Sequence, residues 1–322
     1  QYVYESLLGR ADSGVSLPYE QADSVTDTVV NCLADVSSPF FLWTHYMDVH
    51  APHHPPDRHF RAFGGEPPNW ECHHDEWLAA KAEPTTVGDG TTQRFVDAYD
   101  AEIRFVDEQI ERLFGEMKGL GIHDNTLYIV TADHGELLGE HRKYSHPPRL
   151  YDELTHVPLL MHLPGVTENK TVDELVSLID VPTTITDALD ISPPETYRGT
   201  SLLPAIDKEI SPHEYVFAEV CHRPTEGMSA GNYDPTKSIV SCRGKTGKLV
   251  RDEQRDTETI CIVDEDGIRP DTDGTLGEDQ RVAFRNAIDA HLQEIETTDR
   301  QQESADIDEE TAARLRDLGY VE

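Results

Sequence analysis

Residues 132–136 combine side chains that can bind a metal ion. The sequence Ala-Asp-His-Gly-Glu places the carboxylate of Asp133 beside the imidazole of His134, before a glycine that allows a tight turn. Both side chains can ligate one divalent cation. The same residues can also form a simple turn after a strand, so on their own they leave both interpretations open.

A second segment is rich in a residue that moves protons. Seven of the sixteen histidines lie between positions 45 and 74. Near neutral pH a histidine can donate a proton to a leaving group or hydrogen-bond an anion. For four of them we expect a solvated loop instead: His53, His54, His73 and His74.

Hydrophobic patterns predict the elements that would position these residues. Helical spacing of apolar residues predicts helices over 24–36 and 92–118, and short apolar runs predict buried strands over 40–44 and 127–131. A helix between two such strands is the pattern of a parallel sheet. Ligands of such sheets bind at the carboxyl ends of the strands, so a site is expected in the segments that follow residues 44 and 131.

The remaining chain predicts an α/β domain followed by a smaller one. Residues 47–91 are rich in proline and are expected to form a long loop without regular structure. Further expected elements of the first domain are helices over 148–155 and 180–189 and strands over 157–163 and 175–179. We place its end at residue 204, so that it spans 1–204 and has a mostly parallel central sheet flanked by helices.

Residues 205–322 form the second predicted domain, an α+β subdomain. Short strand-like runs separated by turn residues predict an antiparallel meander. Two helices are expected after it. The expected strands cover 215–220, 238–242, 248–251 and 259–263, and the helices cover 282–292 and 310–318.

The composition excludes some classes of protein. The formal net charge is −35, with 62 acidic and 27 basic residues spread along the chain. This favours a surface selected for solubility at high salt, as in a halophile, and argues against nucleic-acid binding. The five cysteines show no C-x-x-C spacing, and there is no apolar run long enough to span a membrane. We expect a cytoplasmic protein, although the chain begins with Gln1 and a lost signal segment stays open.

Four segments resemble the sulfatase family of the alkaline phosphatase superfamily, in a halophilic archaeal form. Residues 39–56 are similar to its run P-F-F-L-W-x-H-Y-M-D-x-H-A-P-x-x-P-P, and residues 131–141 to T-A-D-H-G-E-x-L-G-E-H. Residues 146–160 are similar to H-G-x-x-L-Y-D-E-x-x-R-V-P-L, and residues 314–322 to the family's common ending. The resemblance implies an alkaline phosphatase-like fold and the hydrolysis of sulfate esters.

The resemblance also implies roles for single residues. Asp133 and His134 match the second pair of metal ligands, for which Ca²⁺ is the first expectation and Mg²⁺ or Mn²⁺ are alternatives. His50 matches the histidine that contacts the sulfate and assists the leaving oxygen. His146 matches a position near the sulfate that is a lysine in many relatives. Four neighbours are plausible contacts, with structural pairing favoured for each: Glu136, His141, Lys143 and Arg149.

Two parts of the family pattern are absent from the sequence. No cysteine stands in the C-x-P-x-R motif that holds the formylglycine nucleophile, and the first Asp-Asp ligand pair is absent. The chain is therefore expected to begin within the domain, to expose an apolar strand edge, and to be catalytically incompetent alone. The coding sequence upstream of Gln1 would settle which nucleophile belongs to the enzyme.

Two other functions stay open. A phosphonate or phosphodiester hydrolase of the same superfamily shares the Asp-His-Gly ligand pair. A non-catalytic binding protein could have kept the fold. The substrate is expected to be a small-molecule or carbohydrate sulfate ester, with Trp70 and Trp77 of a loop over 57–91 available to stack on a sugar. The sequence does not determine the oligomeric state.

Overall fold

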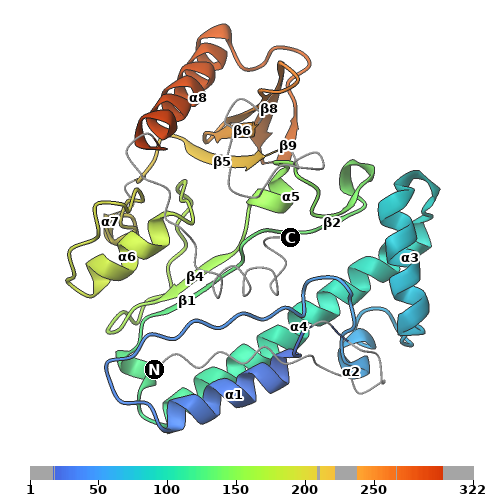
Figure 1. Ribbon diagram of the computed structural model, residues 1–322, viewed down its shortest axis with the longest axis vertical. Coiled ribbons are helices and arrows are strands. Elements are labelled where there is room, and N and C mark those ends of the chain that lie inside the picture. The colour runs from blue at the N-terminus through green and yellow to red at the C-terminus, as the bar shows by residue number, and fades with distance from the viewer. Residues whose placement is uncertain (1–16, 18, 209–210, 222–237, 266, 300–322) are drawn as a thin grey trace. The chain divides into compact units, whose positions relative to one another are not determined.

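The computed structural model describes residues 17, 19–208, 211–221, 238–265 and 267–299. It divides into two compact units (Figure 1). Unit 1 comprises residues 1–147 and 156–167, and unit 2 comprises residues 148–155 and 168–322. The predicted boundary after residue 204 rests on sequence character alone and stays a prediction. The predicted helix over 310–318 and the segment 314–322 lie outside the described residues.

Unit 1 is built around two long helices, α1 and α4, which lie side by side (Figure 1). Helix α1 spans Ala22–Ala34 and helix α4 spans Asp89–Gly119, as the apolar spacing predicted. Val29 and Leu33 of α1 pack against Leu113 and Met117 of α4, and all four are buried. Burying one stripe of each helix provides much of the free energy that holds such a pair together.

The segment between these helices is more regular than the sequence suggested. It contains helix α2, Asp57–Phe60, and helix α3, Trp70–Ala82. Prolines stop a helix only in its interior, and here they precede α2 and α3 or open the short 3₁₀ turn Pro84–Thr86. The side chain of Asn69 accepts a hydrogen bond from the Cys72 N–H at 2.9 Å and so caps α3.

The strands of unit 1 are short. Strand β1, Tyr128–Thr131, pairs in antiparallel register with β4, Leu159–His162. Strand β2, Leu137–Leu138, pairs with β3, Tyr144–Ser145, in a two-residue ladder. The expected strands over 127–131 and 157–163 are thus confirmed, but the predicted burial of the first is wrong, because none of the residues of β1 is buried.

The expected buried strand over 40–44 is wrong. These residues form no strand, and Phe41 and Trp43 are 77% and 64% exposed. A strand needs a hydrogen-bonded neighbour, and no described strand pairs with this segment. The parallel pairing expected between 40–44 and 127–131 is therefore not present in the described residues.

Unit 2 consists of a five-stranded antiparallel sheet with one long helix on it, together with three short helices. The expected meander is confirmed, and its strands follow one another in sequence order. The expected strand over 175–179 is wrong, because these residues form a bend and a turn before α6. The elements of unit 2 are α5 Asp152–Thr155, α6 Asp180–Ala188, α7 Leu203–Lys208, β5 Val216–Cys221, β6 Ser238–Arg243, β7 Gly247–Asp252, β8 Thr257–Asp264, β9 Gly267–Pro270 and α8 Glu278–Asp299.

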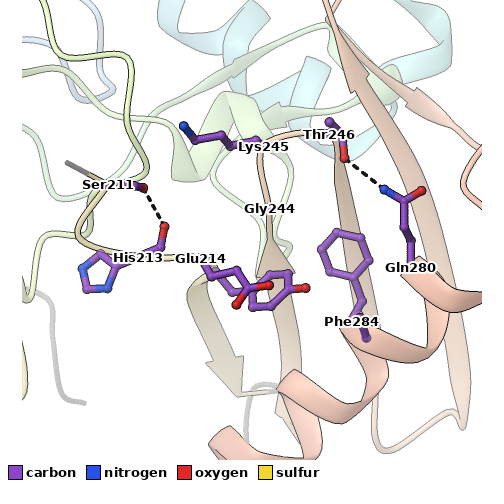
Figure 2. Close-up of a pocket in the computed structure, with 10 residues that line it drawn as sticks. Ser211, His213, Glu214, Gly244, Lys245, Thr246, Gln280 and Phe284 are labelled. Carbon is purple, nitrogen blue, oxygen red and sulfur yellow. Dashed lines mark hydrogen bonds between the residues drawn. The ribbon is translucent and has the colours of Figure 1, made fainter. Parts of the chain in front are cut away.

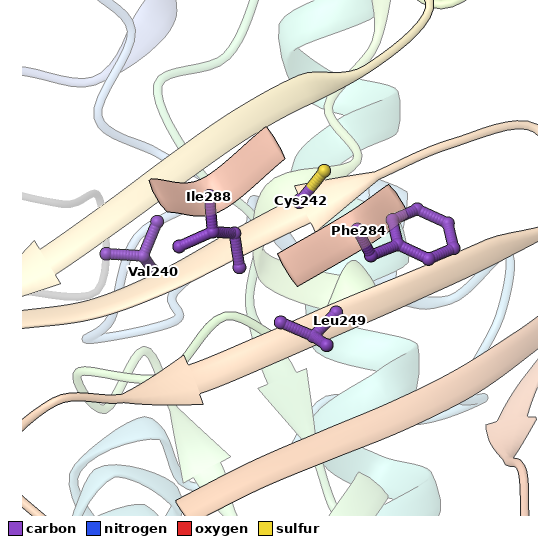
Figure 3. Packing of buried hydrophobic residues seen from close by; sticks show 5 residues of the cluster. All are labelled: Val240, Cys242, Leu249, Phe284 and Ile288. Atoms are coloured by element: carbon purple, nitrogen blue, oxygen red, sulfur yellow. The ribbon is translucent and has the colours of Figure 1, made fainter. Parts of the chain in front are cut away.

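The core of unit 2 lies between α8 and the sheet (Figure 3). Phe284 and Ile288 of α8 pack on Val240, Cys242 and Leu249 of β6 and β7, and all five are buried. Gly247 permits this close approach, because a Cβ atom there would lie 2.8 Å from Leu276 and 3.0 Å from Phe284. Among the described residues the cysteines form no disulfide, and no described helix is long and apolar enough to cross a membrane.

Candidate active site

Three of the four predicted site residues lie together in unit 1. The ring centroid of His146 is 5.0 Å from that of His50 and 4.5 Å from that of His134. His50 follows the extended segment after α1, His134 follows β1, and His146 follows β3. Segments separated by about a hundred residues of chain therefore bring three imidazole rings to one place.

Asp133 precedes this cluster in the turn after β1. Its Oδ1 atom accepts a hydrogen bond from the backbone N–H of His134 at 2.9 Å, and its side chain is 58% exposed. The carboxylate therefore keeps its other oxygen available to a cation. The two predicted metal ligands are neighbours in space, with the His134 ring next to His146.

The ring nitrogens of two histidines have defined directions. Nδ1 of His50 lies 2.7 Å from the Ala51 carbonyl oxygen, and Nδ1 of His134 lies 2.8 Å from the Gly135 carbonyl oxygen. A carbonyl oxygen can only accept, so each Nδ1 carries a proton and donates. The Nε2 atom of each neutral ring is then left to bind a cation or to exchange a proton with a ligand.

Partial burial lowers the pKa of His50, because desolvation penalises the imidazolium form. The hydrogen bond to Ala51 opposes this shift, the nearby His146 adds to it, and Glu136 opposes it. His50 is therefore neutral at neutral pH in the absence of an anion. A bound anion would favour protonation of His50, as an opposite charge at short range does.

Glu136 places a carboxylate beside the cluster. Its side chain is 3% exposed, and Oε2 lies 3.5 Å from Nδ1 of His146. That distance is too long for a well-formed hydrogen bond but short enough for charge attraction. Glu136 was expected to form a structural pair, and its partner is the predicted site residue His146.

Asp133 and His134 can supply only part of a metal site. Ca²⁺ takes six to eight oxygen ligands, and these two residues offer one carboxylate and one imidazole nitrogen. Within the part of the chain that the structure describes, no group of three or more His, Cys, Asp or Glu side chains could hold a metal ion. The donor set fits an incomplete site that needs further ligands.

The expected solvated histidine loop is wrong. His53, His54 and His73 are 3%, 7% and 2% exposed, and their rings pack among aromatic residues. The ring of His53 lies edge-on to Trp77 at 4.8 Å, and that of His73 lies edge-on to Phe95 at 5.2 Å. Histidine is buried readily when its ring packs and a nitrogen finds a partner, which periodicity alone does not reveal.

The tryptophans proposed to stack on a sugar are also buried. Trp70 and Trp77 are 6% and 1% exposed. Both lie on α3 and pack toward α4, where Trp70 contacts Ala98 and Trp77 contacts Phe95. Neither can stack on a ligand in solvent, so this argument for a carbohydrate substrate falls away.

Sequence reasoning missed a buried carboxylate behind the cluster. Glu102 of α4 is fully buried, and its oxygens lie 2.6 Å from Nδ1 of His53 and 2.6 Å from the His54 backbone nitrogen. Its position in the helical pattern, between the apolar Ala98 and Phe105 on the inward face, was the available signal. A charged residue on such a face must have a partner.

Unit 2 contains a separate cavity of about 470 Å³ (Figure 2). It lies between the segment before β5, the β6–β7 turn and the first turns of α8. Its polar groups already have partners in several cases, such as Lys245, which is 2.6 Å from Glu174, and His213, which is 2.8 Å from Asp180. None of the predicted site residues lines this cavity.

Comparison with known proteins places the chain in a family. The model of the family described as Sulfatase matches residues 4–191. Arylsulfatase K of Bos taurus is 36% identical over 107 residues, which cover 33% of this chain and 20% of that protein. An arylsulfatase of Clostridium perfringens is 28% identical over 230 residues, covering 65% of this chain and 48% of the relative. The chain thus spans less than half the length of these relatives.

Solved structures confirm the expected fold class, which is that of the alkaline phosphatase-like sulfatases. BT4656, solved in complex with its substrate D-glucosamine-2-N,6-O-disulfate, has a TM-score of 0.67 at 18% identity over 88% of this chain and 72% of its own. The phosphonate monoester hydrolase SpPMH from Silicibacter pomeroyi has a TM-score of 0.60 at 21% identity over 89% of this chain and 64% of its own. At such identities the likeness shows the fold alone.

Proposed function

Because the chain belongs to the sulfatase family, we propose that its histidine cluster is the sulfate-binding part of a sulfuric ester hydrolase. The observation that carries the proposal is the meeting of His50, His134 and His146 from three separate segments. The three rings are only partly buried, and the ring nitrogens that make no hydrogen bond within the protein need partners from a ligand or from solvent. A bound oxyanion and a cation would supply those partners.

Each side chain has a role that its surroundings support. His50 keeps Nε2 available and can donate a proton to the leaving oxygen once an anion has favoured its protonation. His146, with Glu136 behind it, can donate a hydrogen bond to the sulfuryl oxygens. Asp133 and His134 would hold the divalent cation, with Ca²⁺ as the first expectation. When bound, the cation would neutralise charge on the sulfuryl oxygens.

The activity expected of this chain is binding rather than turnover. None of its five cysteines stands in a C-x-P-x-R motif, and the S-x-P-x-R letters at residues 145–149 belong to the segment that carries His146. We therefore infer that the chain offers no formylglycine nucleophile. Hydrolysis of a sulfate ester would require that group. We therefore expect the chain to bind inorganic sulfate and to leave aryl sulfates intact.

For the substrate we propose a sulfated sugar. The support comes from BT4656, whose bound substrate is a disulfated glucosamine and whose fold this chain shares. The second candidate is a phosphonate monoester, because the phosphonate monoester hydrolase SpPMH shares the fold too. Both ester groups carry one negative charge, but sulfur has four oxygen neighbours whereas phosphorus has three oxygens and one carbon, so competition can separate them.

The test is calorimetric titration of the chain with sulfate and with methylphosphonate, in the presence of Ca²⁺. Sulfate should bind more tightly, and H50N and H146N should each weaken it about 10- to 100-fold, the usual effect of losing one hydrogen bond to a charged group. H156N is the matched control, because His156 is exposed and lies in the same unit. Tighter methylphosphonate binding would favour the second candidate, and equal sulfate affinity in all variants would refute the site.

A further inference from the structure

Glu102 joins helix α4 to the segment that carries His50. We call residues 47–56 the histidine loop. Oε1 of Glu102 accepts a hydrogen bond from the backbone N–H of His54, and Oε2 lies 2.6 Å from Nδ1 of His53. Glu102 is 48 residues from His54 in sequence, so these bonds fix two distant parts of unit 1 on each other.

Two further hydrogen bonds hold the histidine loop, one before His50 and one after it. Oδ1 of the buried Asp48 accepts a hydrogen bond from the N–H of Ala22 at 3.0 Å. The hydroxyl of Tyr19 donates to the carbonyl oxygen of Pro52 at 3.1 Å. His50 thus lies between anchored residues, two positions after Asp48 and three before His53.

We propose that Glu102 is a positioning residue for His50, and that it acts as one half of a buried pair with His53 that shares one proton. The role of His50 in this proposal rests on the proposed function. The attachment of the histidine loop to α4 rests on the hydrogen bonds alone. Glu102 itself touches neither substrate nor cation. It acts by holding the histidine loop on α4.

The charge state of the pair follows from its burial. A lone carboxylate or a lone imidazolium at a fully buried position would be strongly destabilised, whereas a pair that shares a proton is neutral overall. The carboxylate of Glu102 offsets the desolvation of the imidazolium and raises the pKa of His53 above 6.5. Five other titratable groups interact electrostatically with one member of the pair: Asp48, His73, Tyr19, Tyr99 and Glu136.

The shared proton gives the pair a distinct pH signature. Above pH 6.5 the unfolded chain releases the proton of His53, whereas the folded pair retains it. Stability from the pair is therefore full below about pH 6.5 and is lost as the pH rises through the raised folded pKa. His73, whose pKa is lowered to about 4, has finished titrating by then, whereas Asp48, whose pKa is raised to about 6, still titrates at the acid end of this range.

E102Q separates charge from shape. The glutamine side-chain oxygen can still accept a hydrogen bond from the His54 N–H. The neutral amide cannot share a proton with His53 or balance the charge of its imidazolium form. The thermal unfolding midpoint of the wild-type chain should exceed that of E102Q by at least about 2 °C near pH 6.5. This difference should shrink as the pH rises to 8.5. E111Q, an exposed change on the same helix, should show no such trend. A wild-type-minus-E102Q difference that is constant from pH 6 to 8.5 would overturn the shared proton.

The positioning role is tested by sulfate binding at pH 6.5 in the presence of Ca²⁺. E102Q keeps the bond to the His54 N–H and should bind sulfate within about threefold of the wild type. E102A loses both bonds and should bind at least about tenfold more weakly. A folded E102A variant that binds sulfate as tightly as the wild type would refute the positioning role. If E102A does not fold, an E102Q variant that binds sulfate much more than threefold more weakly than the wild type would refute it. Failure of the wild-type chain to bind sulfate would count against the proposed function alone, since the pH test of the pair does not depend on it.

Discussion

Helix α8 of unit 2 packs on its sheet through apolar side chains, whereas helix α4 of unit 1 also buries a carboxylate and imidazole rings. Phe284 and Ile288 of α8 pack on the sheet of unit 2, whereas Glu102 of α4 contacts His53 and His54 in unit 1. An apolar interface gains free energy from every buried methylene. A polar one must match each group with a partner and gains less.

The difference indicates that the interior of unit 2 serves mainly stability, whereas part of the interior of unit 1 serves to position a site. Unit 1 contains the three-histidine cluster, and the polar interior lies directly behind the histidine loop. Directional hydrogen bonds fix a loop more specifically than apolar contacts do, at a cost in stability. Unit 2 also buries a carboxylate, that of Asp180, which pairs with His213 and accepts hydrogen bonds from two backbone N–H groups, but it holds none of the predicted site residues there. Its cavity holds none of them either.

The largest expected effect of a single change falls on the apolar interior. F284A removes a ring that is 4% exposed and should cost unit 2 about 3–5 kcal/mol of unfolding free energy. All three tryptophans lie in unit 1, so their fluorescence reports that unit, whereas far-ultraviolet circular dichroism reports both. We expect the dichroism transition to shift to lower denaturant and the fluorescence transition to stay. Equal shifts in both would show that the two units unfold as one.

A smaller effect is expected at the start of α3. N69A removes the side chain that accepts from the Cys72 N–H and should cost about 1 kcal/mol. Trp70 and Trp77 lie on this helix, so the loss should appear in the fluorescence transition. N69D, which can still accept the bond, should recover most of it. An unchanged N69A transition would mean that α3 is held by its packing alone.

The smallest effect is expected at the surface. Arg94 and Glu76 form an ion pair at 2.8 Å, with side chains 41% and 46% exposed. Solvent and salt screen such pairs, so E76Q should change the unfolding free energy by no more than about 0.5 kcal/mol. Repeating the denaturation at high salt should abolish even that. A larger loss that persists in salt would indicate a role beyond charge pairing.

The helices and the meander could be predicted because their signals are local. The apolar stripe over 92–118 is visible in sequence and becomes the inward face of α4. The runs at 238–242 and 248–251 alternate with turn residues, and they form β6 and β7. The exposed segment 40–44 could not be predicted, because strand formation depends on a neighbour that no local pattern reveals.

Residue types and spacing were enough to predict the candidate site residues. They did not predict the buried residues that pack behind the site. His50, Asp133, His134 and His146 stand in recognisable motifs, and the structure brings the three histidines together. Burial of His53, Trp77 and Glu102 depends on contacts between α3, α4 and the histidine loop. Those contacts span up to 49 residues of sequence, beyond the reach of any periodicity.

The central claim is that the three histidines form one sulfate site, and nuclear magnetic resonance of the imidazole Cε1–H groups tests it most directly. Titration of the chain with sulfate, in the presence of Ca²⁺, should shift the signals of His50, His134 and His146 together, with one dissociation constant. The signal of the exposed His156 should stay in place. Shifts with separate constants, or no shift at any of the three, would contradict the account.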